Sequence, residues 1–183
     1  MLVDKLDHII LGCQKNQRQS QAELYKMFSS RMYAVCLRYT SSRDDAQDVL
    51  QEGFVKIFEN IANFKAQGSF EGWMKRIFVN LALDKFRSRI SMLSLDEFTE
   101  EEAHNQPSAL DNMSEKEILE VVRQLPDQYR LVFNLYVMEG HSHQEIASML
   151  GISESTSRSN LARAKLILKN KLQFNASWIE KAI

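Results

Sequence analysis

The chain has 183 residues, of which 44% are hydrophobic and 26% are charged, a composition typical of one ordinary globular domain or two small ones. Its 23 basic and 24 acidic residues leave a formal net charge of −1, which excludes a simple polycation. Because phosphate neutralisation supplies most of the affinity of an unaided nucleic-acid binder, any such function here needs local basic patches or a partner.

Glycine and proline are scarce, with six and two residues respectively, and the many turns of a β-sandwich would need more. We therefore expect an all-α fold. Cys13 and Cys36 fit neither a disulfide framework nor a metal-ligand spacing. No apolar stretch approaches the roughly 18 residues of a membrane span, and no basic segment precedes the apolar run 9–11. We expect no signal peptide, no membrane insertion and a cytoplasmic location.

Apolar residues at helical spacing predict three helices in the first half of the chain. The first has an apolar stripe that includes Tyr25 and ends near Thr40. The second begins at Ser42-x-x-Asp45, which is a capping-box pattern. The third covers residues 70–89. Three or four helices with such stripes can bury one core by packing helix on helix.

The helical periodicity fades after residue 90, and the charge becomes negative. Between residues 91 and 117, eight acids stand against Lys116 alone, a net charge of −7. With Pro107 and several Ser, Asn and Gln residues, this segment predicts a flexible acidic linker over 92–116. On composition alone, a solvated spacer is the simplest interpretation.

A second helical unit is predicted from residue 117 onward. Pro126 can open a helix at its first turn, and Gly140 can end that helix in the left-handed conformation. A short helix over 143–150, a tight turn and a longer helix over 154–172 follow.

The strongest motif is the run from His143 to Ile152, which has the pattern of a helix-turn-helix: Ile146 and Leu150 pack inward, and Gly151 permits the turn. Five basic residues against one acid give the last helix a net charge of +4. Small hydroxyl, amide and guanidinium groups at its start suit base edges and phosphates; the alternative is an ordinary charged amphipathic helix. The candidate DNA contacts are Ser155, Thr156, Arg158, Ser159, Asn160 and Arg163.

The third predicted helix carries polar residues spaced by four, four and three positions, which places them on one face. Aromatic residues stand just before this face and at its start. Rings on which bases stack, together with cations that follow phosphates, suit single-stranded nucleic acid. From this helix alone, aromatic core residues beneath a solvated face are the simpler interpretation. The polar residues are Arg76, Asn80, Asp84 and Arg87, and the aromatic residues are Phe64, Phe70 and Trp73.

The second predicted helix has an acidic polar side that includes Asp48, Gln51 and Glu52. Taken alone, such a face indicates only a solvated surface. Gly53, in the middle of this helix, costs about 1 kcal/mol relative to alanine, and the pattern gives no reason for it.

Taken in order, these segments resemble an extracytoplasmic-function (ECF) sigma factor, the smallest kind of bacterial RNA polymerase sigma subunit. The run 45–54 resembles the family's core-binding helix, and 70–87 resembles its promoter-melting and −10 recognition segment. The run 125–133, with Glu145-Ile-Ala147 and the segment 156–164, resembles its −35-binding domain. The resemblance covers most of the chain, and three motifs in the right order are far more specific than a lone helix-turn-helix.

The resemblance implies two small helical domains: a region 2-like domain over 1–91 and a region 4-like domain over 117–183, joined by the acidic linker 92–116. The linker would thread the active-site channel of the polymerase, where its charge imitates nucleic acid. The implied partners are core RNA polymerase, promoter DNA and an anti-sigma factor. No enzymatic activity, cofactor or metal is implied.

The resemblance also assigns roles to residues. The contact with core polymerase falls on Asp48, Gln51 and Glu52. The pocket for a base flipped from the −10 strand falls on Phe64, the loop 65–69 with Lys65, Gln67 and Ser69, and Asn80, bordered by Arg76, Asp84 and Arg87. The −35 element meets Ser155, Arg158, Ser159 and Arg163 on the last helix. Two residues depart from the family pattern: Ser155 replaces a common glycine, and Ser157 replaces an apolar anchor whose packing we expect Leu161 to supply.

Two other functions fit part of the sequence. A stand-alone helix-turn-helix regulator, with N-terminal helices that dimerise or bind an effector, explains the C-terminal motif but leaves the residues from Phe64 to Arg87 unused. An enzyme or metal protein built on His141-x-His143 is a more distant alternative. Positions i and i+2 of a helix do not face each other, and helix-terminal polar residues are the simpler interpretation.

Overall fold

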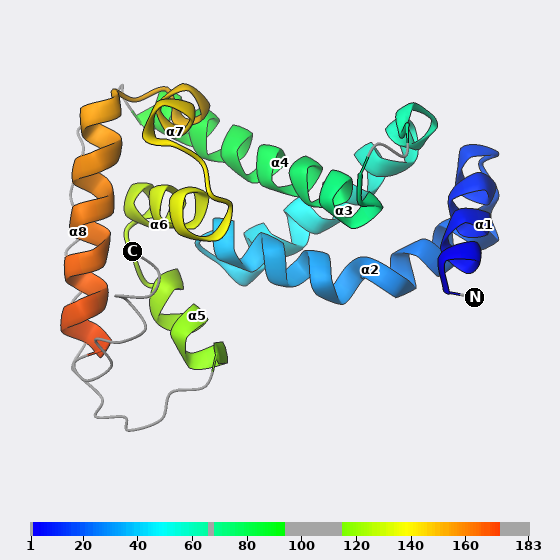
Figure 1. The fold of residues 1–183 in the computed structure, drawn as a ribbon, viewed down its shortest axis with the longest axis horizontal. Helices are drawn as coiled ribbons and strands as arrows, with labels where there is room; N and C mark the ends of the chain where they lie inside the picture. The colour runs from blue at the N-terminus through cyan, green and yellow to red at the C-terminus, as the bar shows by residue number, and fades with distance from the viewer. Residues whose placement is uncertain (1, 66–67, 94–114, 173–183) are drawn as a thin grey trace. The chain divides into compact units, whose positions relative to one another are not determined.

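The computed structural model describes residues 2–65, 68–93 and 115–172 (Figure 1), and contains no strand within them. The all-α prediction is therefore confirmed. Compactness divides the chain into two units, residues 1–37 with 42–82 and residues 38–41 with 83–183. Most of the predicted linker, the residue Gln67 and the last eleven residues lie outside the described ranges.

Three helices of the first unit follow the predicted apolar stripes closely, and the one predicted over 70–89 extends to residue 93. A further helix at the start of the chain, over residues 2–14, was not predicted from the sequence. Two of these helices continue into the second unit at their C-terminal ends. The elements are α1 (Leu2–Gln14), α2 (Arg18–Tyr39), α3 (Arg43–Asn60), the short 3₁₀ turn η1 (Ile61–Asn63) and α4 (Phe70–Leu93).

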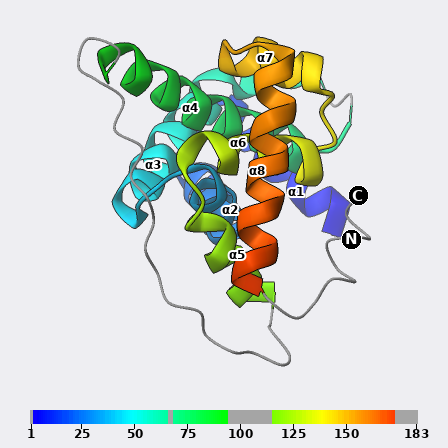
Figure 2. The ribbon, with the colours of Figure 1, turned by 90° about the vertical axis from the view of Figure 1, so that its left-hand side faces the viewer.

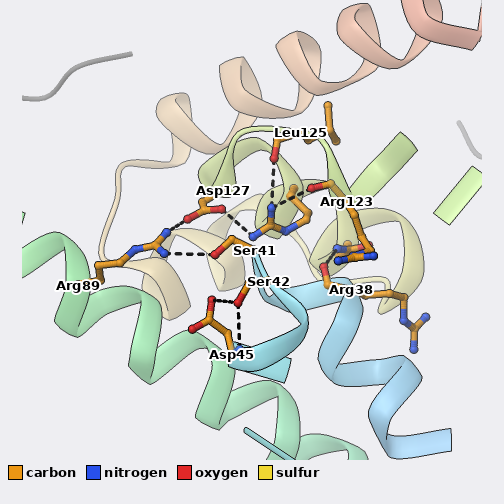
Figure 3. Close-up of polar contacts among 10 residues, drawn as sticks. Arg38, Ser41, Ser42, Asp45, Arg89, Arg123, Leu125 and Asp127 are labelled. Carbon is orange, nitrogen blue, oxygen red and sulfur yellow. Dashed lines mark hydrogen bonds and ion pairs between the residues drawn. The ribbon is translucent and has the colours of Figure 1, made fainter. Parts of the chain in front are cut away.

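The start of α3 shows how its sequence selects a boundary. Ser42 is the N-cap: its hydroxyl oxygen accepts the Asp45 backbone N–H at 3.0 Å, and its O–H donates to the Asp45 carboxylate at 2.7 Å (Figure 3). Asp44 and Asp45 place negative charge in the first turn, where the helix dipole favours it. The helix start predicted from Ser42-x-x-Asp45 is confirmed.

The close packing of α3 on α4 explains Gly53. A Cβ atom at Gly53 would lie 2.1 Å from the ring of Phe78, and Phe78 is fully buried. The same ring packs edge-on against Phe54 with centroids 5.5 Å apart. Glycine is therefore required at position 53 of α3 because the Phe78 side chain of α4 leaves no room for a Cβ atom. Tyr25 was predicted in the core but is 43% exposed, although its ring contacts Phe54.

The second unit contains the predicted helix-turn-helix, in which α8 runs beside α6 and α7 (Figure 2). Pro126 is the N-cap of α6, one residue before the position predicted for it. Gly151 ends α7 in the left-handed conformation, with φ 68°, which glycine adopts without a steric penalty, and Gly140 has φ 75°. The elements are α5 (Glu115–Arg123), α6 (Asp127–Phe133), the π-helical turn η2 (Asn134–Met138), α7 (His143–Leu150) and α8 (Glu154–Leu172).

The turn between α5 and α6 is held by a buried arginine. Arg130 is 3% exposed and donates to the backbone carbonyls of Arg123 and Leu125, each at 3.2 Å, and to the Asp127 carboxylate at 2.7 Å. A buried charge is tolerated when it is paired and hydrogen-bonded in this way.

Polar contacts explain why residues 38–41 and the end of α4 belong to the second unit. The Asn134 amide donates to the Arg38 carbonyl at 2.7 Å, and the Tyr39 hydroxyl donates to Glu139 at 3.0 Å. Arg89 pairs with Asp127 and donates to Ser41 (Figure 3). Burial, followed by the charge of Glu139, raises the pKa of Tyr39.

Candidate nucleic-acid interface

Three aromatic rings form a cluster at the start of α4. The Phe64 ring meets Phe70 edge-on, with centroids 4.9 Å apart, and lies 5.4 Å from the Trp73 ring. Phe70 is 5% exposed and also packs against Phe28. Phe64 and Trp73 are only half-buried. The inner ring therefore anchors the cluster in the core, and the outer two retain exposed surface on which a base can stack.

The N-terminus of α4 is fixed by side chains around that cluster. Ser69, one of the predicted pocket residues, uses its hydroxyl oxygen to accept the Gly72 backbone N–H at 3.2 Å, as an N-cap does. Glu71 forms an ion pair with Arg31 of α2 at 2.6 Å. Ser69 thus has a structural role, and Lys65, earlier in the same loop, is exposed. Gln67 lies outside the described residues.

All four predicted polar residues on α4 are exposed, which agrees with a face directed away from the core. Arg87 pairs with Asp84 one turn earlier on the same helix, whereas the core side of α4 is lined by Met74 and Phe78, both fully buried. The face combines cations with one amide and one carboxylate. It consists of Arg76, Asn80, Asp84 and Arg87.

The acidic face of α3 is also exposed. Asp48, Gln51 and Glu52 all face solvent, and Glu52 lies 4.0 Å from Lys56. The neighbouring Val55, which had no role predicted from the sequence, is 55% exposed. Val55 lies one helical turn after Gln51 and Glu52, so an apolar side chain stands within this acidic face. The signal in the sequence is an apolar residue outside the buried stripe.

The start of α8 is a network of small hydroxyl groups. The Ser153 hydroxyl lies 2.8 Å from that of Ser155 and 2.7 Å from that of Thr156, and it accepts the Thr156 backbone N–H at 3.0 Å. Ser159 donates to the Thr156 carbonyl at 3.0 Å. The helix start therefore presents ordered hydroxyls beside backbone N–H groups, an arrangement suited to phosphate oxygens.

The two arginines of α8 that are predicted to reach DNA already have partners. Arg158 is ion-paired with Glu154 one turn before it on α8. Arg163 donates to the Tyr129 hydroxyl at 3.2 Å, and its guanidinium carbon lies 6.0 Å from the centroid of that ring. Both arginines are exposed. Contact with DNA must therefore exchange a weak surface interaction for one with a base or phosphate.

The buried position of Asn160 does not favour the DNA contact predicted for it. Asn160 is 3% exposed, and its amide points toward Gln128 of α6, where the donor–acceptor distance is 3.4 Å. It lies one turn after the buried Ser157, on the side of α8 that also holds Leu161 and Ala164. The helical spacing of these residues in the sequence would have indicated that Asn160 lies on the buried side of α8. Leu161 is 6% exposed, as expected if it supplies the packing that Ser157 lacks.

Neither histidine near the start of α7 forms part of a metal cluster among the described residues, where no group of three potential ligands occurs. His141 lies 4.0 Å from the Glu145 carboxylate, and His143 is hydrogen-bonded to Ser157 at 2.9 Å. Ser142 and Glu145 form a reciprocal capping box at this helix start. Both histidines therefore contact neighbouring polar groups at a helix end.

Within the described part of the chain, no helix has both the length and the apolar character needed to cross a membrane.

Two family models match the chain, one over its first half and the other over its second half. Residues 24–90 match Sigma-70 region 2, which includes the acidic face of α3, the aromatic cluster and most of α4. Residues 110–168 match Sigma-70, region 4, which includes the helix-turn-helix. Together the matched segments cover more than half of the chain.

Individual proteins give the same result. The chain is 31% identical over 161 residues to ECF RNA polymerase sigma factor SigE of Mycolicibacterium smegmatis. The aligned segment covers 85% of this chain and 62% of that relative. The chain is also 31% identical over 180 residues to probable RNA polymerase sigma factor RfaY of Xanthomonas campestris, covering 94% and 44% respectively. The chain thus spans less than two thirds of each relative's length.

A similar fold occurs among solved structures. The sigma factor RpoE of Bartonella quintana, solved in complex with the anti-sigma factor NepR, gives a TM-score of 0.52 at 18% identity. The likeness covers 84% of this chain and 97% of that one.

Proposed function

Because the chain belongs to the ECF group of the sigma-70 family, we propose that it directs core RNA polymerase to promoters by binding both the −10 and the −35 elements. The observation that carries this proposal is the pairing of two exposed polar surfaces, each in the segment that matches one sigma region. We take residues 1–91 as the region 2 domain, 92–116 as the acidic linker and 117–183 as the region 4 domain.

The aromatic cluster and the face of α4 bind the melted −10 strand in this proposal. Extruding a base costs a few kcal/mol, and stacking on Phe64 or Trp73 returns roughly 1–3 kcal/mol per base. The exposed amide of Asn80 can read a base edge, while Arg76 and Arg87 follow the phosphates. We assign Lys65, Gln67 and Ser69 to the same contact with the strand.

The acidic face of α3 binds the polymerase. Asp48 and Glu52 supply negative charge, Gln51 supplies an amide, and Val55 supplies an exposed apolar contact. A charged rim around an apolar centre is the usual composition of a protein interface. The partner surface is therefore basic with an apolar centre.

The recognition helix α8 reads the −35 element through its first two turns. Arg158 contacts a base or phosphate after it leaves Glu154, and the hydroxyls of Ser155, Thr156 and Ser159 supply shorter-range contacts. Arg163, one turn later, contacts the phosphate backbone. The exposed part of α8 thus supplies both base and backbone contacts.

Neither DNA surface is strong by itself, since the whole chain has a formal charge of −1 and counterion release by so few cations is small. When core polymerase holds both domains on one promoter, the second contact becomes intramolecular and gains a high effective concentration. The acidic linker further opposes binding of free DNA. This function places the chain in the cytoplasm and assigns it no catalytic step; an anti-sigma factor is its expected inhibitor.

The test is transcription in vitro with core polymerase over a library randomised at the −10 and −35 positions. Addition of the chain is expected to give initiation from a defined subset with both elements enriched. A stand-alone regulator would instead bind a duplex site without polymerase and would not comigrate with the core enzyme. Tight, selective binding of duplex DNA by the free chain would overturn the proposal.

A further inference from the structure

A fully buried serine lies within the recognition helix. Ser157 has 0% exposure, whereas Arg158 and Ser159 beside it are exposed. Burying a hydroxyl is unfavourable unless it is hydrogen-bonded, and an aliphatic side chain at this position would bury more apolar area. The contacts of Ser157 must therefore offset that difference.

Ser157 is joined to two earlier elements through His143. The His143 Nδ1 and Ser157 Oγ atoms are 2.9 Å apart. The His143 ring stacks on Tyr136 of η2, with centroids 4.6 Å apart and an interplanar angle of 23°, and Lys165 of α8 lies over the same tyrosine at 6.0 Å. These contacts connect η2, α7 and α8, and we call the three residues the Tyr136–His143–Ser157 cluster.

The protonation state of His143 agrees with this arrangement. Burial lowers the pKa of His143 below its ordinary value, and the cation of Arg158 lowers it further, while Glu154 opposes the change and Lys165 adds to it. The neutral ring, favoured near neutral pH, keeps one nitrogen able to accept a hydrogen bond.

A hydrogen bond differs from an apolar contact in having a direction. Apolar burial depends on area and is non-directional, so an aliphatic anchor tolerates small rotations of a helix about its axis. A hydrogen bond between Ser157 and the ring of His143 does not tolerate such rotations. Since each residue of a helix advances the rotation by about 100°, the rotation set at Ser157 also sets the directions of Ser155, Arg158 and Ser159.

We propose that Ser157 and His143 are positioning residues that fix the rotation of α8 and thereby sharpen its preference among −35 sequences. Neither residue contacts DNA in this proposal; they act through Arg158 and its neighbours. The inference rests on the proposed function, because it concerns how one promoter element is read.

The experiment uses holoenzyme assembled from core polymerase and the full chain. Its readout is the ratio of initiation from a promoter with the selected −35 element to initiation from one with that element altered, at a constant −10 element. Ser157→Ala removes the hydroxyl, and His143→Phe keeps a ring against Tyr136 but removes Nδ1. His143→Asn restores a polar atom near the Nδ1 position. His141→Phe is the matched control, because it makes the same change outside the cluster.

Ser157→Ala and His143→Phe are each expected to lower the ratio about 3- to 10-fold, the range of one hydrogen bond, and the double variant to lower it no further. His143→Asn should recover most of the ratio, and His141→Phe should leave it unchanged. Association with core polymerase reports folding, and the His143 variants keep the test decisive if Ser157→Ala is unstable.

Two results would overturn the inference alone: single variants that retain the wild-type ratio, or a double variant whose loss equals the product of the single losses. If wild-type holoenzyme initiates without any preference at the −35 positions, the proposed function fails first, and the inference fails with it. The wild-type measurement therefore distinguishes the two failures.

Discussion

Helices α4 and α8 each carry predicted DNA contacts on an exposed polar face, but the side chains that order those contacts differ. On α8, hydroxyls bond to one another and to the backbone, and Arg158 is held by Glu154 of the same helix. On α4, the residues beside the predicted contacts come from elsewhere in the chain: Phe64 precedes the helix, and Arg31 of α2 holds its first turn.

The difference agrees with the ligand proposed for each surface. A recognition helix that enters intact duplex DNA meets base edges at fixed positions, so contacts ordered within one helix suffice. A surface that receives a base removed from the duplex needs rings and an amide around a space, and one helix does not supply these. The hydroxyls and Arg158 at the start of α8 are therefore ordered within that helix, although Arg163 contacts Tyr129 of α6 and Ser157 contacts His143 of α7. The α4 surface, by contrast, depends on tertiary packing.

The largest expected effect concerns a third surface on which both DNA contacts depend. Asp48→Lys with Glu52→Lys should weaken association with core polymerase about 100-fold or more, because like charges placed across an interface cost several kcal/mol. The measurement is the dissociation constant for core polymerase. Asp7→Lys with Glu23→Lys makes the same change of charge at two exposed acids of α1 and α2 and should bind normally. Wild-type affinity of the α3 variant would exclude this face.

Removing the amide of α4 should have the next largest effect. Asn80→Ala should shorten the open-complex lifetime about 10- to 100-fold, since a flipped base then loses a hydrogen-bond partner in a desolvated pocket. Asn170→Ala removes the same group from an exposed position late in α8 and serves as the control. Core association should be unchanged in both variants. An unaltered lifetime for Asn80→Ala would reject base capture by this residue.

Local patterns in the sequence predicted the parts of the molecule that local physics determines. α7 and α8 begin and end where Ser142, Gly151 and Ser153 supply caps and a left-handed turn, and the start of α3 follows from Ser42. The exposed faces of α3 and α4 also follow, because helical periodicity alone separates them from the core.

Residues whose role is set by a distant neighbour could not be predicted in the same way. Gly53 is required by the Phe78 ring on another helix, and Tyr25 is exposed despite its place in an apolar stripe. Ser157 and Asn160 are polar side chains on the buried side of α8, paired with His143 and Gln128. A polar residue at the start of a recognition helix predicts DNA contact unless its position around the helix is considered as well.

A smaller loss of promoter affinity is expected from a change on α8, because Arg158 must leave Glu154 before it can contact DNA. Arg158→Ala should weaken promoter binding by holoenzyme about 5- to 30-fold, within the 1–3 kcal/mol range of a base-reading arginine, and should relax preference at one −35 position. Glu154→Gln releases Arg158 without removing it and should strengthen binding. The measurement is affinity for intact and altered −35 elements at fixed salt. An equal loss of affinity for the intact and the altered −35 element would indicate that Arg158 contacts a phosphate rather than a base.

The smallest effect tests whether the helix-turn-helix is held locally, as the comparison requires. Hydrogen bonds from the Ser142 backbone N–H and hydroxyl lower the pKa of Glu145 below its ordinary value of 4.5. A carboxylate with a depressed pKa stabilises the fold above its unfolded pKa and loses that contribution as pH falls through its folded pKa. Ser142→Ala removes the hydroxyl but keeps the backbone N–H, which is the larger cause. The pKa of Glu145 should therefore rise only part of the way toward 4.5, as measured from its carboxyl ¹³C shift.

Ser159→Ala, which removes a hydroxyl from α8 instead, should leave that titration unchanged. The cap lies between His141 and the start of α7 and involves no residue of another helix. If Ser142→Ala left the titration of Glu145 as it is in the wild type, the Ser142 hydroxyl would contribute nothing to this carboxylate, and the backbone N–H alone would hold it. The local order of the recognition unit would then rest on the hydroxyls at the start of α8, and the contrast with the α4 surface would be smaller.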